Sequence, residues 1–288
     1  GPRLIVFTSD IPATKGAIAA GPGHDWVDTV QFEDSDGFHI PVGPPAAGRS
    51  ARRPTASPGP VAPNIEIGAG TEVGSSASSG TVGCVLLDTG GTPYYLTAGH
   101  VLPRSGDVAY YGATPIGCVV GASTVPTGLD WSLIKANLSA AQPTDTIVYD
   151  CLTLSNPLAV GDLQQLAKQT IGMSGAASKE RRLGTVVSVG TCLAVTQIVG
   201  GVCKRYVFDD QIIVKSATAR RFGPPGDSGA VAYLNTALMA SGITYPEGAA
   251  IGLYWREDPP RDLHALAPMP QVLKAIKDTT RLQLSLLP

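Results

Sequence analysis

Short apolar segments separated by glycine- and proline-rich turns recur along most of the chain. Between positions 81 and 154 six of them follow one another: TVGCVLLD, TPYYLTA, DVAYYG, TPIGCVV, LDWSLIKA and TIVYDCLTL. Short runs rich in Val, Ile, Thr and Tyr and bounded by turn residues are typical of β-strands. The pattern therefore predicts a first six-stranded β-barrel over about 65–156.

A second set of apolar segments follows a linker around 157–161. It comprises QQLAKQTIG, RRLGTVVSVG, CLAVTQI, VCKRYVFDDQIIV, GAVAYL and AAIGLYW. Val199-Gly200-Gly201 has the composition of a hairpin turn. These segments predict a second six-stranded barrel over about 162–256.

The pattern changes near the end of the chain. Between Met269 and Lys277 the apolar residues Val272, Leu273 and Ile276 recur at helical spacing. This predicts a helix over about 268–278 that packs on the second barrel, with 279–288 as a tail. The predicted fold is mainly β: two antiparallel six-stranded barrels with a C-terminal helix and an N-terminal extension.

Residues 1–64 do not fit the barrel pattern. They hold two apolar segments, Leu4–Thr8 and Trp26–Phe32, too little for an independent core, so we expect them to pack on the barrels or to be the remnant of a preceding domain. The stretch 43–63 is rich in Pro, Ala, Ser and Gly, as in an extended linker. Its arginines at 49, 52 and 53 either serve solubility or mark a processing site. The opening Gly1-Pro2 is typical of residues left by an expression vector.

Composition excludes several function classes. Among 288 residues the formal net charge is −2, so the sequence indicates no general attraction to nucleic acid. No apolar run approaches the ~20 residues of a membrane span. We therefore expect neither a nucleic-acid nor a membrane partner, and the sequence leaves the oligomeric state open.

The five cysteines, at positions 84, 118, 151, 192 and 203, form no C-x-x-C pair. A hairpin at 200–201 places Cys203 opposite Gln197 or Ile198 rather than Cys192. We therefore expect free thiols and a reducing, cytoplasmic compartment. With no H-E-x-x-H motif, no metal or other cofactor is predicted. IGAGTEVG at 67–74 does not complete a G-x-G-x-x-G motif and is interpreted as turn structure.

The segment GPPGDSGAVAY, residues 223–233, encloses Ser228 between glycines and prolines just before an apolar strand. Proline fixes φ and glycine permits conformations that other residues avoid, so such a loop has a defined backbone. If the N–H groups of Gly226 and Ser228 converge beside the Ser228 hydroxyl, the loop through Asp227 supplies both a nucleophile and an oxyanion hole.

A nucleophilic serine requires a base and an orienting carboxylate. His100 ends the strand segment YYLTAGHVL, whereas His24 and His39 lie in an irregular region and His264 in a proline-rich loop. Asp130 opens the strand segment LDWSLIKA. His100 and Asp130 are therefore the candidate base and acid.

The three strings TAGHV, LDWSLI and GDSGA, in that order, resemble the motifs of the chymotrypsin-like or trypsin-like serine endopeptidases, in the style of compact bacterial members. The resemblance covers roughly 65–278 and implies a pair of six-stranded antiparallel barrels. It implies His100 as general base, Asp130 as its orienting carboxylate and Ser228 as nucleophile. Two departures, Gly99 before the histidine and Ala230 after GDSG, exchange one small residue for another, so we expect them to be tolerated.

The resemblance also implies the reaction: hydrolysis of peptide bonds in a polypeptide substrate through an acyl-enzyme. It implies that extended substrate pairs with the strand edge near Ile251–Tyr254. The specificity pocket is expected to be lined by five residues: Arg221, Phe222, Gly252, Leu253 and Tyr254. None of them carries a carboxylate that would bind Lys or Arg, so a preference for basic residues is not expected.

In this family Asp227 would pair with a new amino terminus, and no suitable terminus is visible. We therefore expect an internal partner for Asp227 rather than activation by a cut near Arg49–Arg53. Two alternatives remain. One is an esterase of another fold that uses Ser228, Asp258 or Asp262, and His264, although its G-x-S-x-G elbow would precede a helix. The other is a trypsin-like fold that serves as a binding module.

Overall fold

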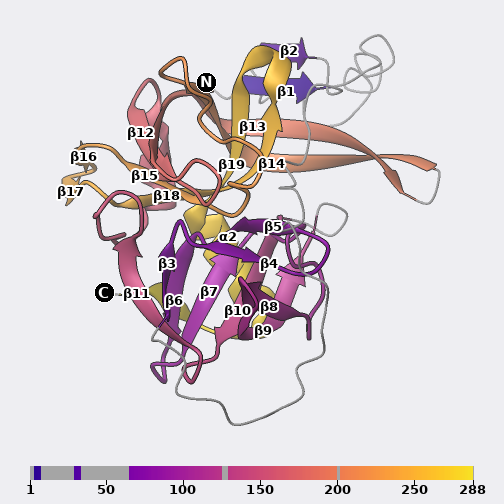
Figure 1. The fold of residues 1–288 in the computed structure, drawn as a ribbon. Coiled ribbons are helices and arrows are strands. Elements are labelled where there is room, and N and C mark those ends of the chain that lie inside the picture. Colours follow the sequence, from indigo (N-terminus) through magenta and orange to yellow (C-terminus); the bar gives the residue numbers. More distant parts are fainter. Residues whose placement is uncertain (1–2, 8–28, 34–64, 125–128, 200–201, 288) are drawn as a thin grey trace.

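The computed structural model describes residues 3–7, 29–33, 65–124, 129–199 and 202–287. The described chain is mainly β and forms two barrel-like units stacked one above the other, with helix α2 (Met269–Thr280) between them (Figure 1). The predicted fold class is confirmed. The arginine-bearing stretch 43–63 lies outside the described residues.

The first unit is an eight-stranded sheet with a parallel strand pair beside it. Its strands follow the order β20-β6-β7-β10-β9-β8-β4-β5, and β3 pairs with β11. The bounds are β3 Ile65–Ala69, β4 Glu72–Gly74, β5 Ser79–Thr81, β6 Cys84–Asp88, β7 Pro93–Thr97, β8 Val108–Tyr111, β9 Thr114–Ser123, β10 Trp131–Ala136, β11 Ala141–Ile147 and β20 Leu284–Leu286.

This unit differs in detail from the predicted six strands. The segment 67–74, interpreted as turn structure, contributes to β3 and to β4, which are joined at Gly70, where φ is +91°. Glycine accepts that conformation without strain, so the chain reverses between two short strands. Strand β20 comes from the segment 279–288, expected as a tail, and pairs with β6, where Leu286 is buried.

The second unit is a closed barrel of six strands in the order β12-β13-β14-β19-β18-β15. Their bounds are β12 Thr170–Ser174, β13 Arg181–Val199, β14 Val202–Ser216, β15 Val231–Leu234, β18 Ala250–Asp258 and β19 Leu263–Pro268. A short hairpin of β16 (Leu238–Ala240) and β17 (Ile243–Tyr245) stands outside it.

Three local predictions for this barrel change. RRLGTVVSVG and CLAVTQI belong to one long strand, β13, because Gly190 (φ +72°) and register shifts let the chain bend without ending the strand. QQLAKQTIG contains the end of a 3₁₀ helix, Val160–Leu166, before β12. His264 lies in strand β19, not in a loop. The hairpin register pairs Ile198 with Cys203, as predicted.

One apolar cluster holds the two units together. It contains Trp131 and Leu133 of the first unit, Leu253 and Trp255 of the second, and the buried face of α2. The helix buries Met269, Val272 and Ile276, which confirms the helical spacing read from the sequence. Each such side chain contributes about 1.5–3 kcal/mol when removed from water. The cluster therefore fixes loops of one unit relative to those of the other.

Near the amino terminus, β1 (Arg3–Phe7) and β2 (Thr29–Glu33) form a parallel pair, and β1 lies beside β13 (Figure 1). Both strands overlap the apolar segments predicted there, Leu4–Thr8 and Trp26–Phe32. Four cysteines whose side chains are described are free, namely Cys84, Cys118, Cys151 and Cys192. Within the described residues, no helix has the length and apolar character needed to span a membrane.

Candidate active site

Strand pairing brings His100 and Asp130 together. Thr97, near the end of β7, pairs with Ser132, near the start of β10, so the loops at these strand ends meet. The Asp130 carboxylate is buried and lies 2.5 Å from His100 Nδ1 through Oδ2. Its Oδ1 accepts the backbone N–H of His100 at 2.9 Å. The aspartate therefore fixes both the ring and the backbone of the histidine.

Gly99 is required by this arrangement rather than merely tolerated. A Cβ at this position would lie 2.0 Å from the Ser123 carbonyl oxygen and 2.9 Å from Asp130 Oδ1. The close approach lets the chain pass between β9 and β10 and deliver His100 to the carboxylate. The expectation that a glycine would be tolerated before His100 agrees with this contact, which leaves no room for a Cβ.

The opposite side of the imidazole is left available for chemistry. With Nδ1–H donated to Asp130, Nε2 is the ring's acceptor. This atom is buried and has no hydrogen-bond partner among the described residues. A buried acceptor without a partner is costly, so it marks a place where a hydroxyl proton or a substrate is expected to bind.

The loop that carries Ser228 belongs to the second unit and packs on the first. The Ser228 carbonyl accepts the Thr81 N–H at 2.8 Å, and the Gly226 carbonyl accepts Thr81 Oγ1 at 2.9 Å. A Cβ on Gly229 would lie 2.3 Å from Thr97 Oγ1 and 2.7 Å from the Ala98 nitrogen. Ser228 is thereby placed beside the end of β7, which leads directly to His100.

The backbone of this loop is held in one conformation. Gly226 has φ +100°, which disfavours any side chain, and the next N–H, that of Asp227, donates to the Pro224 carbonyl at 3.0 Å. The Ala230 N–H donates to the Asp227 carbonyl at 2.9 Å. These bonds close tight turns on both sides of the serine.

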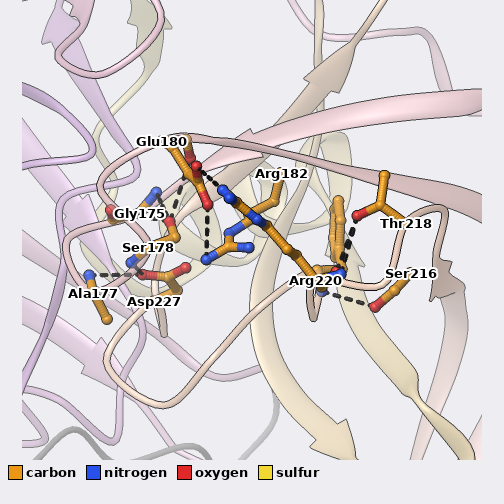
Figure 2. Close-up of polar contacts among 10 residues, drawn as sticks. Gly175, Ala177, Ser178, Glu180, Arg182, Ser216, Thr218, Arg220 and Asp227 are labelled. Carbon is orange, nitrogen blue, oxygen red and sulfur yellow. Dashed lines mark hydrogen bonds and ion pairs between the residues drawn. The ribbon is translucent and has the colours of Figure 1, made fainter.

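The Asp227 side chain is buried behind this loop. The segment between β12 and β13 contacts it (Figure 2). Its Oδ1 accepts the N–H groups of Ala177 at 2.8 Å and Ser178 at 3.0 Å. Gly175 allows the contact, because a Cβ there would lie 2.2 Å from the carboxylate carbon. Burial raises the pKa of Asp227, and the two amides and the nearby Arg182 charge oppose that rise.

Glu180 ties the same segment to its surroundings (Figure 2). One carboxylate oxygen lies 2.9 Å from the guanidinium of Arg182, and the other pairs with Arg220. The arginines come from β13 and from the stretch before Phe222. The segment that supports Asp227 is therefore anchored on two sides.

The residues predicted to line the specificity pocket differ from one another in burial and in the contacts they make. Phe222 and Tyr254 are fully buried, and the Tyr254 hydroxyl donates to the Gly223 carbonyl at 2.7 Å. Arg221 is partly exposed and pairs with Glu257 at 3.3 Å. Glu257 is a buried carboxylate of this region that was not predicted from the sequence. It lies in the charged run Arg256-Glu257-Asp258, and such a run is not expected to be buried in a strand.

The free edge of β18 also differs from the expected one. Gly252 and Leu253 pair with β15 on one side and β19 on the other, so this part of the strand offers no edge to a substrate. From Trp255 to Asp258, among the described strands, β18 pairs with β19 alone. The unpaired edge therefore begins at Trp255 and not at Ile251. At this point β15 has ended and the Ser228 loop begins.

His264, the histidine of the alternative esterase, is occupied elsewhere. It is 1% exposed, lies edge-on to Phe222 with ring centroids 5.6 Å apart, and its Nε2 is 3.2 Å from Asp262 Oδ1. Burial lowers its pKa to about 4. Ser228 precedes a strand, β15, rather than a helix, so the nucleophile elbow of the α/β-hydrolases is absent from this position.

Thr81, Ala177 and Ser178 support the site, and no sequence signal identified them. Their contributions are a backbone amide, a hydroxyl or both, which residues of many kinds supply. The described residues contain no group of His, Cys, Asp and Glu side chains that would hold a metal ion.

No protein-family model matches the sequence, and no curated protein does either. Solved structures do match the fold. Thermobifida fusca protease A superimposes with a TM-score of 0.54 at 15% identity, over 77% of this chain and 100% of that one. An α-lytic protease homologue, N4, gives 0.52 at 17% identity, over 74% and 97% of the two chains. A glutamic-acid-specific serine protease gives 0.51 at 16% identity, over 77% and 100%.

These similarities concern the arrangement of strands and not the sequence, since identities stay at or below 17%. They agree with the resemblance read from the three motifs. The chain therefore has the fold of the chymotrypsin-like serine proteases.

Proposed function

We propose that the chain is a serine endopeptidase that uses His100, Asp130 and Ser228. The observation that carries the proposal is the short contact between His100 Nδ1 and the buried Asp130 carboxylate, at the strand end against which the Ser228 loop packs. A carboxylate at Nδ1 and an unpartnered Nε2 are what a general base for a serine hydroxyl requires.

In the proposed reaction Ser228 Oγ attacks the carbonyl carbon of the scissile bond while His100 Nε2 takes its proton. The imidazolium then gives this proton to the leaving amine, and an acyl-enzyme remains on Ser228. A water molecule then attacks the acyl-enzyme while His100 takes its proton, and the proton passes to Ser228 Oγ. This step releases the carboxylic acid product and the free serine. Asp130 keeps the proton on Nδ1 and stabilises the imidazolium.

The oxyanion of each tetrahedral intermediate would be held by the N–H groups of Gly226 and Ser228. Such a donor is worth about 3 kcal/mol of transition-state stabilisation. The positive φ of Gly226 and the anchored Asp227 side chain support the required loop conformation. The reaction as written needs no cofactor.

The test is labelling with a fluorophosphonate, which reacts with an activated serine. We expect the probe to label one residue, Ser228, and labelling to disappear in Ser228→Ala. Labelling that persists in this variant, or a wild-type protein that stays unlabelled, would favour the binding-module alternative.

The same assay tests the proposed acid. Asp130→Asn should fold normally and lower turnover of a peptide substrate by about 10⁴-fold, because the imidazole is then held in the wrong tautomer. Asp150→Asn is the matched control, since that carboxylate bonds to Tyr233 and Arg181 and not to His100. Near-normal turnover of Asp130→Asn would remove Asp130 from the mechanism.

A further inference from the structure

Two walls flank Ser228. On one side β18 runs directly beside it: the Gly229 N–H donates to the Tyr254 carbonyl at 2.8 Å, and the Tyr254 N–H donates to the Ala230 carbonyl at 2.8 Å. On the other side lies the stretch 222–227 that leads into the serine. On the proposed function, a substrate whose carbonyl reaches Ser228 would place its P1 side chain, that of the residue before the cleaved bond, between these walls.

The ring of Tyr254 fills the space between the walls. A Cβ built on Gly223 would lie 2.5 Å from Tyr254 Cζ and 2.6 Å from its Cε1, so the ring packs against the backbone of the opposite wall. The hydroxyl donates to the Gly223 carbonyl at 2.7 Å and holds the ring there. Tyr254 is fully buried, as expected of a side chain that closes a gap.

Behind this ring the space is taken by further aromatic side chains. His264 lies with its ring centroid 5.9 Å from that of Tyr254 and 5.6 Å from that of Phe222. All three residues are at most 1% exposed. Close-packed interiors do not admit an added large group without displacing neighbours, which costs binding energy.

Charge restricts the P1 side chain as well as size. Glu257, on β18, and Arg221, which directly precedes the opposite wall, lie 3.3 Å apart. A cationic P1 side chain that approached Glu257 would meet Arg221, and an anionic one that approached Arg221 would meet Glu257. Either charge would face a like charge in a partly buried site.

We propose that Tyr254, packed on Gly223, restricts the P1 residue to Gly, Ala or Ser, so that the chain cleaves after small uncharged residues. This inference rests on the proposed peptidase function and specifies its substrate class. Tyr254 is its specificity-determining residue.

The experiment uses three probes on the full chain. A fluorophosphonate without a P1 side chain reports whether Ser228 is reactive. Two peptide phosphonates carry the P1 side chain of Ala or of Phe. Both have the same randomised mixture of residues at the flanking positions. We expect the Ala probe to label Ser228 at least about 10-fold faster than the Phe probe, because even small differences in pocket fit change rates by this factor.

Two variants locate the cause. Tyr254→Val removes the ring and should reverse or abolish the preference for the Ala probe. Tyr254→Phe keeps the ring and loses only the hydrogen bond to Gly223, so it should retain the preference. Circular dichroism checks the fold of both variants, and the wild-type ratio tests the inference even where Tyr254→Val does not fold.

The outcomes separate the two proposals. If wild-type protein reacts with the fluorophosphonate and is labelled by the Phe probe as fast as by the Ala probe, or faster, the small P1 pocket is overturned. The proposed peptidase function then still stands. A folded Tyr254→Val that keeps the wild-type preference also overturns the role of Tyr254. Wild-type protein that no probe labels overturns the peptidase itself, and the P1 inference with it.

Discussion

Single residues in this protein are constrained by contacts that their sequence context does not reveal. Gly99 and Gly223 each face another group so closely that a Cβ would lie 2.0 Å and 2.5 Å from its nearest neighbour. At Gly99 the nearest neighbour is the Ser123 carbonyl oxygen, with Asp130 Oδ1 at 2.9 Å, and at Gly223 it is the Tyr254 ring. Both glycines serve the proposed site through the space they leave.

His264 gives a prediction at this scale. Its pKa of about 4 lies below the ordinary value of 6.5, mainly through burial and against the hydrogen bond to Asp262. The unfolded chain therefore takes up a proton below pH 6.5 that the folded chain refuses until about pH 4. The free energy of unfolding should fall by roughly 3 kcal/mol over this interval as the pH drops, through this residue alone.

His264→Gln lacks the titration and keeps a side chain that can bond to Asp262. Urea unfolding at pH 7 and at pH 4.5 should show a smaller loss of stability for this variant than for the wild type. Equal losses in the two proteins would mean that His264 is charged in the folded state or that its protonation does not drive the change.

At the scale of elements, α2 does more than cover the second barrel. Its buried residues belong to the same apolar cluster as Trp131 of β10 and Trp255 of β18, so one helix contacts both units. Since His100 and Asp130 belong to the first unit and Ser228 to the second, the helix helps to fix the distance between them.

We predict that Ile276→Ala destabilises the protein by about 2–5 kcal/mol, as is usual when a fully buried aliphatic side chain is truncated. Lys274→Ala is the control on the same helix, since Lys274 is exposed and its ion pair among the described residues is with Asp278, four residues later. Its unfolding midpoint in urea should match the wild type. A similar midpoint for Ile276→Ala would mean that α2 is not part of the cooperative core.

At the scale of the whole molecule, the question is whether the first 62 residues control the site. Asp227 already has donors within the barrels, from Ala177 and Ser178, which is the internal partner expected from the sequence. We predict that the intact chain and a chain beginning at Pro63 react with fluorophosphonate at equal rates at Ser228. Labelling that appears only after trimming would make the first 62 residues a propeptide.

The β class, most strand positions, the C-terminal helix and the three candidate catalytic residues could be predicted from the amino-acid sequence. Strand patterns and motifs such as TAGHV and GDSGA are local, and local information survives in a linear chain. Strand β19 escaped prediction because it is short, His264 stands within it and prolines lie on both sides of its apolar residues. Burial of His264 against the aromatic side chains of Phe222 and Tyr254 outweighs that signal.

The contacts between residues of different strands and loops, by contrast, became known from the folded structure. The donors to Asp227 come from about 50 residues earlier in the chain, the Ser228 loop packs on Thr81, and Tyr254 closes the wall at Gly223. Each of these contacts joins residues far apart in sequence through backbone groups or a packed ring. Backbone amides carry no residue signature and packing depends on the partner surface, so the linear pattern contains neither.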